Sequence, residues 1–242
     1  MKINKLFQIL CCCMFLVQLP VQAIGHKSVV APKISCSTTL SASDVPGLMD
    51  SEQVPFSSIG IVNWDKFPYR PEVSFRIAHT GNYILVHYRV KEKSVLAATP
   101  KDNGLVCTDS CVEFFLSPNS DSFYYNFESN CVGTLLIASG TSQQKRQKAD
   151  QKTLSSVQRW SSLGRKPFQE RVGTCQWEVA LVIPANVLSV RSIQSLDGLR
   201  MKGNFYKCGD KMMTPHYLSW SPIDLPNPCF HCPQFFGDII FE

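Results

Sequence analysis

Two glutamates and a cysteine–histidine cluster are the groups in this sequence whose types and spacing suggest chemistry. Glu113 and Glu128 lie in neighbouring apolar segments, and two carboxyl groups in one site can hydrolyse a glycosidic bond. Nothing in the sequence around either glutamate indicates a raised pKa. The chain also lacks a phosphate-binding glycine loop, a Gly-x-Ser-x-Gly elbow and a His-Glu-x-x-His string. We therefore predict a protein that is not an enzyme, and a glycoside hydrolase is the less favoured alternative.

The second group is Cys229-Phe230-His231-Cys232. Two cysteines at this spacing beside a histidine can bind zinc, with Cys208 and His216 as the nearest further ligands, or form a redox pair. A thioredoxin-like role would need a βαβ context, which the sequence does not show. Because the even number of cysteines after residue 23 suits an oxidising compartment, we predict a disulfide between Cys229 and Cys232.

The first 23 residues have the features of a secretory signal peptide. Lys2 and Lys5 precede an apolar stretch, and small residues before position 24 form a cleavage site at Ala23. Lipid anchoring through Cys11–Cys13 is less favoured, because these residues lie too early and follow no Gly, Ala or Ser. No later segment has the ~20 apolar residues of a transmembrane helix. We expect an exported protein, in the periplasm or outside the cell.

The charge of the chain gives no support to a nucleic-acid role, and no nucleic-acid partner is expected. The formal net charge is +5, and it falls to +3 once Lys2 and Lys5 are removed. So small an excess is poor evidence for nucleic-acid binding. The basic stretch at residues 145–148 has no aromatic residue that could stack on a base, so it is interpreted as a solvated loop.

Short alternating or continuous apolar runs predict an all-β domain. Thr80-Gly81-Asn82 and residues 119–122 are hairpin turns between such runs. Pro184 begins a segment that suits one helical turn. Few helical stretches separate the runs, so we expect one two-sheet antiparallel β-sandwich over residues 36–242, preceded by a linker at 24–35. The predicted strands are 73–79, 83–90, 111–116, 123–127, 134–138, 177–183 and 217–220.

A series of strings, in order along the chain, resembles the family 9 carbohydrate-binding modules and the DOMON-like domains related to them. The resemblance covers about residues 59–242 and includes a family 9-like branch from exported Bacteroidetes proteins. It implies a β-sandwich that binds the end of a glycan or oligosaccharide between two tryptophans, with structural calcium. The strings are DSCVEFFL (109–116), YYNFE (124–128), WEVALVIP (177–184), GNFYKCGD (203–210), PHYLSW (215–220) and FFG (235–237).

The resemblance also implies ligand-binding residues. Trp220 matches one stacking tryptophan, and Glu113 matches a binding glutamate. The second stacking tryptophan precedes that glutamate by six residues, where this chain has Cys107, which cannot cover a sugar ring. The family's binding arginine falls on Tyr124. Two alternatives are open. The missing tryptophan is replaced by the ring of Trp64, Tyr124 or Tyr206, or sugar binding is weakened or lost.

Strand alternation adds polar candidates to this set. Tyr124, Asn126 and Glu128 share one face of their predicted strand, and Arg89 lies on a polar face of another. We expect Trp220 and Glu113 to line one solvent-accessible pocket with at least two of these four residues.

Two functions follow from these observations. The first is a monomeric glycan-binding module that leaves its ligand unaltered. The second is a structural or protein-interaction sandwich that has lost the sugar site, which Cys107 favours. No cofactor is expected, although residues 102–104 and Asp109 are candidate ligands of a structural calcium ion.

Overall fold

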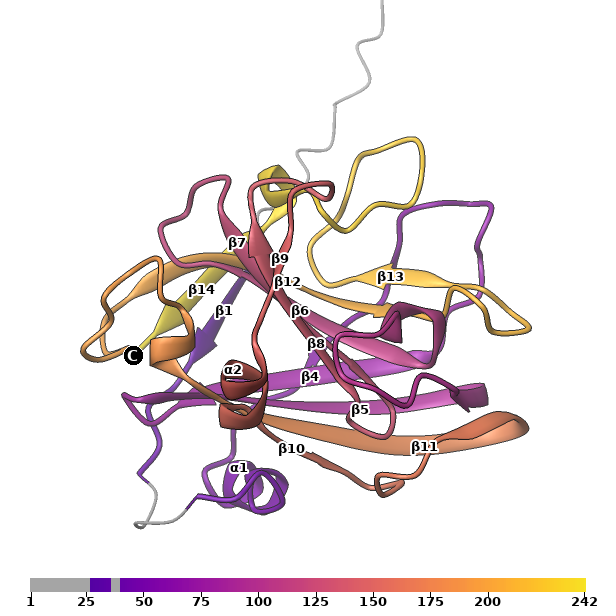
Figure 1. The fold of residues 1–242 in the computed structure, drawn as a ribbon, viewed down its shortest axis with the longest axis horizontal. Coiled ribbons are helices and arrows are strands. Elements are labelled where there is room, and N and C mark those ends of the chain that lie inside the picture. Colours follow the sequence, from indigo (N-terminus) through magenta and orange to yellow (C-terminus); the bar gives the residue numbers. More distant parts are fainter. Residues whose placement is uncertain (1–26, 36–39) are drawn as a thin grey trace, which may run out of the picture.

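The structure, a computed structural model, describes residues 27–35 and 40–242. Two β-sheets pack face to face, as the strand pattern predicted (Figure 1). The smaller sheet is antiparallel and has the strand order β10-β11-β5-β4-β2. Its strands are β2 (Ser57–Ser58), β4 (Glu72–His79), β5 (Tyr83–Ala97), β10 (Gln158–Ser161) and β11 (Phe168–Pro184).

The larger sheet is antiparallel except where β1 runs parallel to β14. Its order is β1-β14-β12-β6-β7-β8-β9, and β13 pairs with both β12 and β3. Its strands are β1 (Ser28–Ala31), β3 (Ile61–Val62), β6 (Cys111–Ser117), β7 (Tyr124–Asn130), β8 (Leu135–Gly140), β9 (Gln147–Lys148), β12 (Arg200–Cys208), β13 (Tyr217–Ser219) and β14 (Gly237–Phe241).

The helices are short and lie outside the two sheets. In Figure 1, α1 lies beneath the smaller sheet, and its buried residues Val45 and Met49 pack against the outer face of that sheet. The helical turn predicted after Pro184 is confirmed as a 3₁₀ helix. The helices are α1 (Val45–Ser51), α2 (Gln151–Ser156), η1 (Val106–Thr108), η2 (Ala185–Val187) and η3 (Pro233–Phe235).

Both predicted hairpins are confirmed. Gly81 joins β4 to β5 with a φ of +88°, a conformation that glycine adopts without the steric cost of a Cβ atom. Ser120 lies in the turn between β6 and β7 and has a φ of +57°. These turns fix the register of two strand pairs.

The main core lies between the sheets, where alternate residues of each strand meet. Phe205 of β12 stacks on Phe75 of β4 and Phe114 of β6, with ring centroids 3.5 and 4.7 Å apart. A second apolar cluster, which includes Phe115, Tyr206 and Phe230, lies on the outer face of the larger sheet. The larger sheet is therefore buried on both faces, and its outer face carries the site described below.

The N-terminal expectations have mixed outcomes. Residues 28–31, expected within a linker, form β1 and pair with β14. The predicted signal peptide lies outside the described residues. Across the described ranges, no helix is both long and apolar enough to cross a membrane.

Candidate functional site

A small pocket of about 130 Å³ opens on the outer face of the larger sheet. Glu113 of β6 and Glu128 of β7 lie at its base, and Asp210 follows β12. Tyr217 and Phe230 supply aromatic surface. The pocket therefore combines three carboxyl groups with two aromatic rings.

Strand alternation explains why both glutamates face outward. On β6, Val112 and Phe114 join the core between the sheets, so Glu113 points to the other side. On β7, Phe127 joins the same core, and Glu128 lies directly opposite Glu113 in the strand register. The predicted orientation of Glu113 and Glu128 is confirmed.

Burial changes the acid–base behaviour of this pocket. Glu113 is 3% exposed and Glu128 is 7% exposed. Desolvation, together with the charge of Glu128, raises the pKa of Glu113 well above its usual range. Desolvation raises the pKa of Glu128 to about 7, although the Asn126 amide, which donates a 2.7 Å hydrogen bond to it, acts in the opposite direction. The sequence analysis found no sign of a raised carboxyl pKa, and this interpretation is wrong. The pKa is raised by burial, and burial depends on loops that cover the sheet and are distant in the sequence.

The stability of the protein should depend on pH through Glu128. Between pH 4.5 and about 7 the unfolded carboxyl group loses its proton while the folded one keeps it, so this residue's contribution to stability falls as the pH rises. Glu128→Gln removes that loss. We expect the variant to gain up to about 3 kcal/mol relative to wild type between pH 4.5 and pH 8, measured by urea unfolding in metal-free buffer. Glu72→Gln is the control, because the side chain of Glu72 is 75% exposed. If the difference in free energy of unfolding between Glu128→Gln and wild type did not change with pH, the raised pKa of Glu128 would be contradicted.

Trp220 does not line this pocket. Its side chain is 3% exposed and lies in the core between the sheets, where it contacts Phe75 and Phe205 edge to face. Its backbone N–H donates to the Phe205 carbonyl at 2.9 Å, which places the side chain on the inner face of the sheet. The expectation that Trp220 and Glu113 share an accessible pocket is therefore wrong.

Arg89 also lies away from the pocket. It belongs to β5 in the smaller sheet, where its Nε donates to Glu178 at 3.0 Å and its guanidinium lies 4.6 Å from the centre of the Phe56 ring. Its exposed orientation matched the prediction, but its strand belongs to the other sheet.

Tyr124 and Asn126 share the outer face with Glu128 but lie beneath Arg146. The guanidinium lies 4.0 Å from the centre of the Tyr124 ring and donates to the Asn126 side chain. The basic segment interpreted as solvated thus places one arginine against the sheet. The Tyr124 hydroxyl group is 3.0 Å from His231 Nδ1, so these residues support the pocket wall.

The aromatic residues of the pocket are not those that the sequence suggested. Trp64 is buried, and its indole donates to the Leu225 carbonyl at 2.7 Å. Tyr206 lies beneath Phe230, with ring centroids 4.1 Å apart. Cys107 does line the pocket with Glu113. Asp210 and Tyr217 were missed as site residues, although each lies in a string that carries the family resemblance.

All seven cysteines that the structure describes are free thiols. The Cys232 thiol is 3.2 Å from the Cys229 carbonyl oxygen, so the predicted disulfide is not formed here. The zinc alternative at this segment is not formed either, because His216 is buried beside Lys207, 2.7 Å from its ammonium group.

The turn at residues 102–104 does not fit calcium, whereas Asp109 stays a candidate, because its buried Oδ1 has no hydrogen-bond partner among the described residues. Asp102 accepts from the Leu135 N–H at 3.0 Å and forms an ion pair with Arg159 at 2.8 Å. The Asn103 backbone carbonyl accepts from Lys148 at 2.7 Å. These oxygens already have donors, two of them cationic, so the turn offers no free set of calcium ligands.

A larger groove, about 710 Å³, lies on the outer face of the smaller sheet. Four of its charged residues form two ion pairs, Lys91 with Glu72 at 2.9 Å and Arg89 with Glu178 at 3.0 Å. Trp177 borders the groove, but its side chain is only 1% exposed. The groove offers no free aromatic face, so the smaller pocket is the better candidate site.

The sequence profile of carbohydrate-binding family 9 matches residues 43–241. A crystal structure from Bacteroides uniformis ATCC 8492, of a protein to which carbohydrate binding has been attributed, is 54% identical to this chain. The match covers 90% of this chain and 100% of that chain, with a TM-score of 0.88.

Two structures of a family 9 module from Caldicellulosiruptor kristjanssonii share the fold. The glucose complex is 13% identical, covers 89% of this chain and 96% of that chain, and has a TM-score of 0.57. The cellotriose complex is 14% identical, covers 89% and 94%, and has a TM-score of 0.58. No curated protein matches the chain.

Proposed function

The chain belongs to carbohydrate-binding family 9, and we propose on that basis that the pocket of Glu113, Glu128, Asp210, Tyr217 and Phe230 binds one end of a glycan without altering it. Membership in a family of carbohydrate-binding modules makes this a binding protein rather than an enzyme. The observation that carries the proposal is the combination of carboxyl groups and aromatic rings in one small pocket.

The size and chemistry of the pocket suit a single sugar unit. Its volume of about 130 Å³ is well below the ~300–1,000 Å³ of pockets for drug-sized ligands. A carboxyl group that keeps its proton both donates and accepts hydrogen bonds, as sugar hydroxyls do. Burial raises the pKa of Glu113 and Glu128, so this pair can serve a hydroxyl group in either role.

Tyr217 and Phe230 supply the apolar surface for the C–H face of the sugar. Cys107 stands where the family resemblance places a second tryptophan, so the ring is covered less completely. We therefore expect weak affinity, with a Kd between about 1 μM and 1 mM. The glucose and cellotriose complexes of the Caldicellulosiruptor kristjanssonii module make glucose-containing oligosaccharides the first ligands to test.

Export forms part of this proposal. The basic and apolar segments that precede Ala23 have the pattern of a secretory signal, and an exported binding module would meet polysaccharides outside the cytoplasm. A monomer needs no further surface for this function.

The substitution Asp210→Ala tests the pocket directly. Asp210 is exposed at the rim, so its removal should leave folding intact while it deletes one hydrogen-bonding group. After a glycan array identifies a ligand, calorimetry should show at least a tenfold weaker Kd, equivalent to about 1.4 kcal/mol. Asp224→Ala, which removes another exposed carboxylate outside the pocket, is the matched control.

Two outcomes would contradict the proposal. Unchanged affinity in Asp210→Ala would place the sugar elsewhere on the molecule. Failure of the folded wild-type protein to bind any glycan on the array would favour the structural or protein-interaction function.

A further inference from the structure

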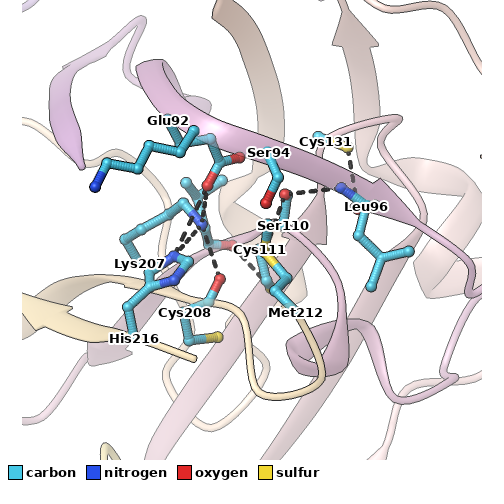
Figure 2. Close-up of polar contacts among 12 residues, drawn as sticks. Glu92, Ser94, Leu96, Ser110, Cys111, Cys131, Lys207, Cys208, Met212 and His216 are labelled. Atoms are coloured by element: carbon cyan, nitrogen blue, oxygen red, sulfur yellow. Dashed lines mark hydrogen bonds and ion pairs between the residues drawn. The ribbon is translucent and has the colours of Figure 1, made fainter. Parts of the chain in front are cut away.

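Two cysteines and a glutamate converge beneath the carbohydrate pocket. Cys111 of β6 lies opposite Cys208 of β12 in the strand register, and Figure 2 shows the two residues close together on these neighbouring strands. The two Sγ atoms and a carboxylate oxygen of Glu113 lie within 4.8 Å of one another, and all three residues are buried. The cluster therefore brings together three atoms of types that bind metals.

The spacing of these atoms is close to that of a tetrahedral metal site. Glu113 Oε1 lies 3.1 Å from Cys208 Sγ and 4.0 Å from Cys111 Sγ. Zinc–sulfur bonds of ~2.3 Å and zinc–oxygen bonds of ~2.0–2.2 Å would separate such ligand atoms by about 3.5–3.8 Å. Shifts of well under 1 Å in the two Glu113 distances would accommodate an ion at the centre.

The buried carboxyl group points to a missing partner. Among the residues that the structure describes, its hydrogen bonds come from the Cys111 and Cys208 thiols, which are weak donors. The nearby Lys207 ammonium is already bound to Glu92 at 2.9 Å. A buried carboxyl group with only weak donors is poorly satisfied, and a divalent cation that replaces its proton would give it a strong partner.

The thiolate is the form of cysteine that coordinates a metal ion, so binding would release the thiol protons of Cys111 and Cys208.

We propose that Cys111, Glu113 and Cys208 bind one thiophilic divalent cation of the zinc class. Two sulfur ligands exclude calcium and magnesium, which prefer oxygen. Glu113 and Cys208 also line the carbohydrate pocket, so the fourth coordination position opens toward it. Three protein ligands with one open position are common at zinc sites that bind a further molecule.

Cobalt(II) titration of the purified protein tests this site without any sugar. Protein reduced with a phosphine and freed of metal should bind one equivalent of Co²⁺, with sulfur-to-cobalt charge-transfer absorption that Zn²⁺ then abolishes. The Cys111→Ser and Cys208→Ser variants should each bind at least a hundredfold more weakly. Cys175→Ser removes a thiol on β11 outside the cluster and should leave the titration unchanged.

A second measurement covers variants that fail to fold. X-ray absorption of the zinc-loaded wild-type protein should show two sulfur neighbours and one or two oxygen neighbours. Four sulfur neighbours, no sulfur neighbours, or no cobalt spectrum in the reduced wild-type protein would overturn the proposal. So would a Cys111–Cys208 disulfide in protein isolated without reductant. A failure here leaves the glycan assay unaffected, because Asp210 and Tyr217 are not metal ligands.

Discussion

Replacing Lys207 with methionine is expected to lower the free energy of unfolding by about 3–5 kcal/mol. Lys207 and Glu92 are fully buried between the sheets, with Nζ 2.9 Å from Oε2 (Figure 2). The Trp177 indole donates to the other Glu92 oxygen at 2.7 Å. Without Lys207, Glu92 would remain buried with only the His216 ring in reach of Oε2, 3.8 Å away. Urea denaturation measures the loss.

Lys202→Met is the matched control for this prediction. Lys202 lies in the same strand, β12, and its ion pair with Asp238 is 2.6 Å long but about one-third exposed. Exposed pairs contribute at most ~1 kcal/mol. Adding Glu92→Gln to Lys207→Met should restore part of the stability, since it removes the unpaired charge. A loss below 1 kcal/mol in Lys207→Met would contradict the importance of the pair.

His216 completes this buried group as a neutral side chain. Desolvation and the positive charge of Lys207 lower the pKa of His216 to about 3. Its Nδ1 lies 2.9 Å from the Thr214 carbonyl and its Nε2 lies 2.7 Å from Lys207 Nζ. The neutral ring therefore donates to the carbonyl through Nδ1 and accepts from the ammonium through Nε2.

Trp220→Ala is expected to destabilise the fold by about 3–5 kcal/mol, because it leaves a cavity the size of an indole ring in the core. Trp160→Ala is the control. Trp160 is partly exposed on the edge strand β10, so this variant should lose less stability. Thermal or urea unfolding measures both variants. If Trp220→Ala kept its stability but lost glycan binding, Trp220 would be a ligand residue and the outer pocket would not be the site.

Much of the fold could be predicted from the sequence because strand alternation and turn residues are local signals. The predicted runs correspond to β4, β5, β6, β7, β8, β11 and β13. Strand β12 was missed as a strand because it carries Lys202 and Lys207 among its apolar residues. The burial of Lys207 depends on Glu92, which is distant in the sequence, so no local pattern indicates it.

The candidate site could be predicted only in part. Alternation correctly placed Glu113 and Glu128 opposite the apolar side chains of their own strands, but only the structure shows that the two strands are neighbours. It could not show that Arg89 belongs to the other sheet, because the order of strands depends on long-range pairing. The side chain of Trp220 was predicted on the wrong face. Its backbone N–H still pairs with the Phe205 carbonyl one residue beyond the end of β13, so the indole points inward, as Phe205 does.

The location of the bound sugar is the most direct test of the proposed function. Isotope-labelled protein can be titrated with the glycan that the array selects, while backbone amide resonances are followed by NMR. We predict the largest shifts at Asp210, Tyr217 and His231, around the outer pocket. If the largest resonance shifts lay instead at Arg89 and Trp177, in the groove of the smaller sheet, the proposal that the outer pocket binds the sugar would be contradicted.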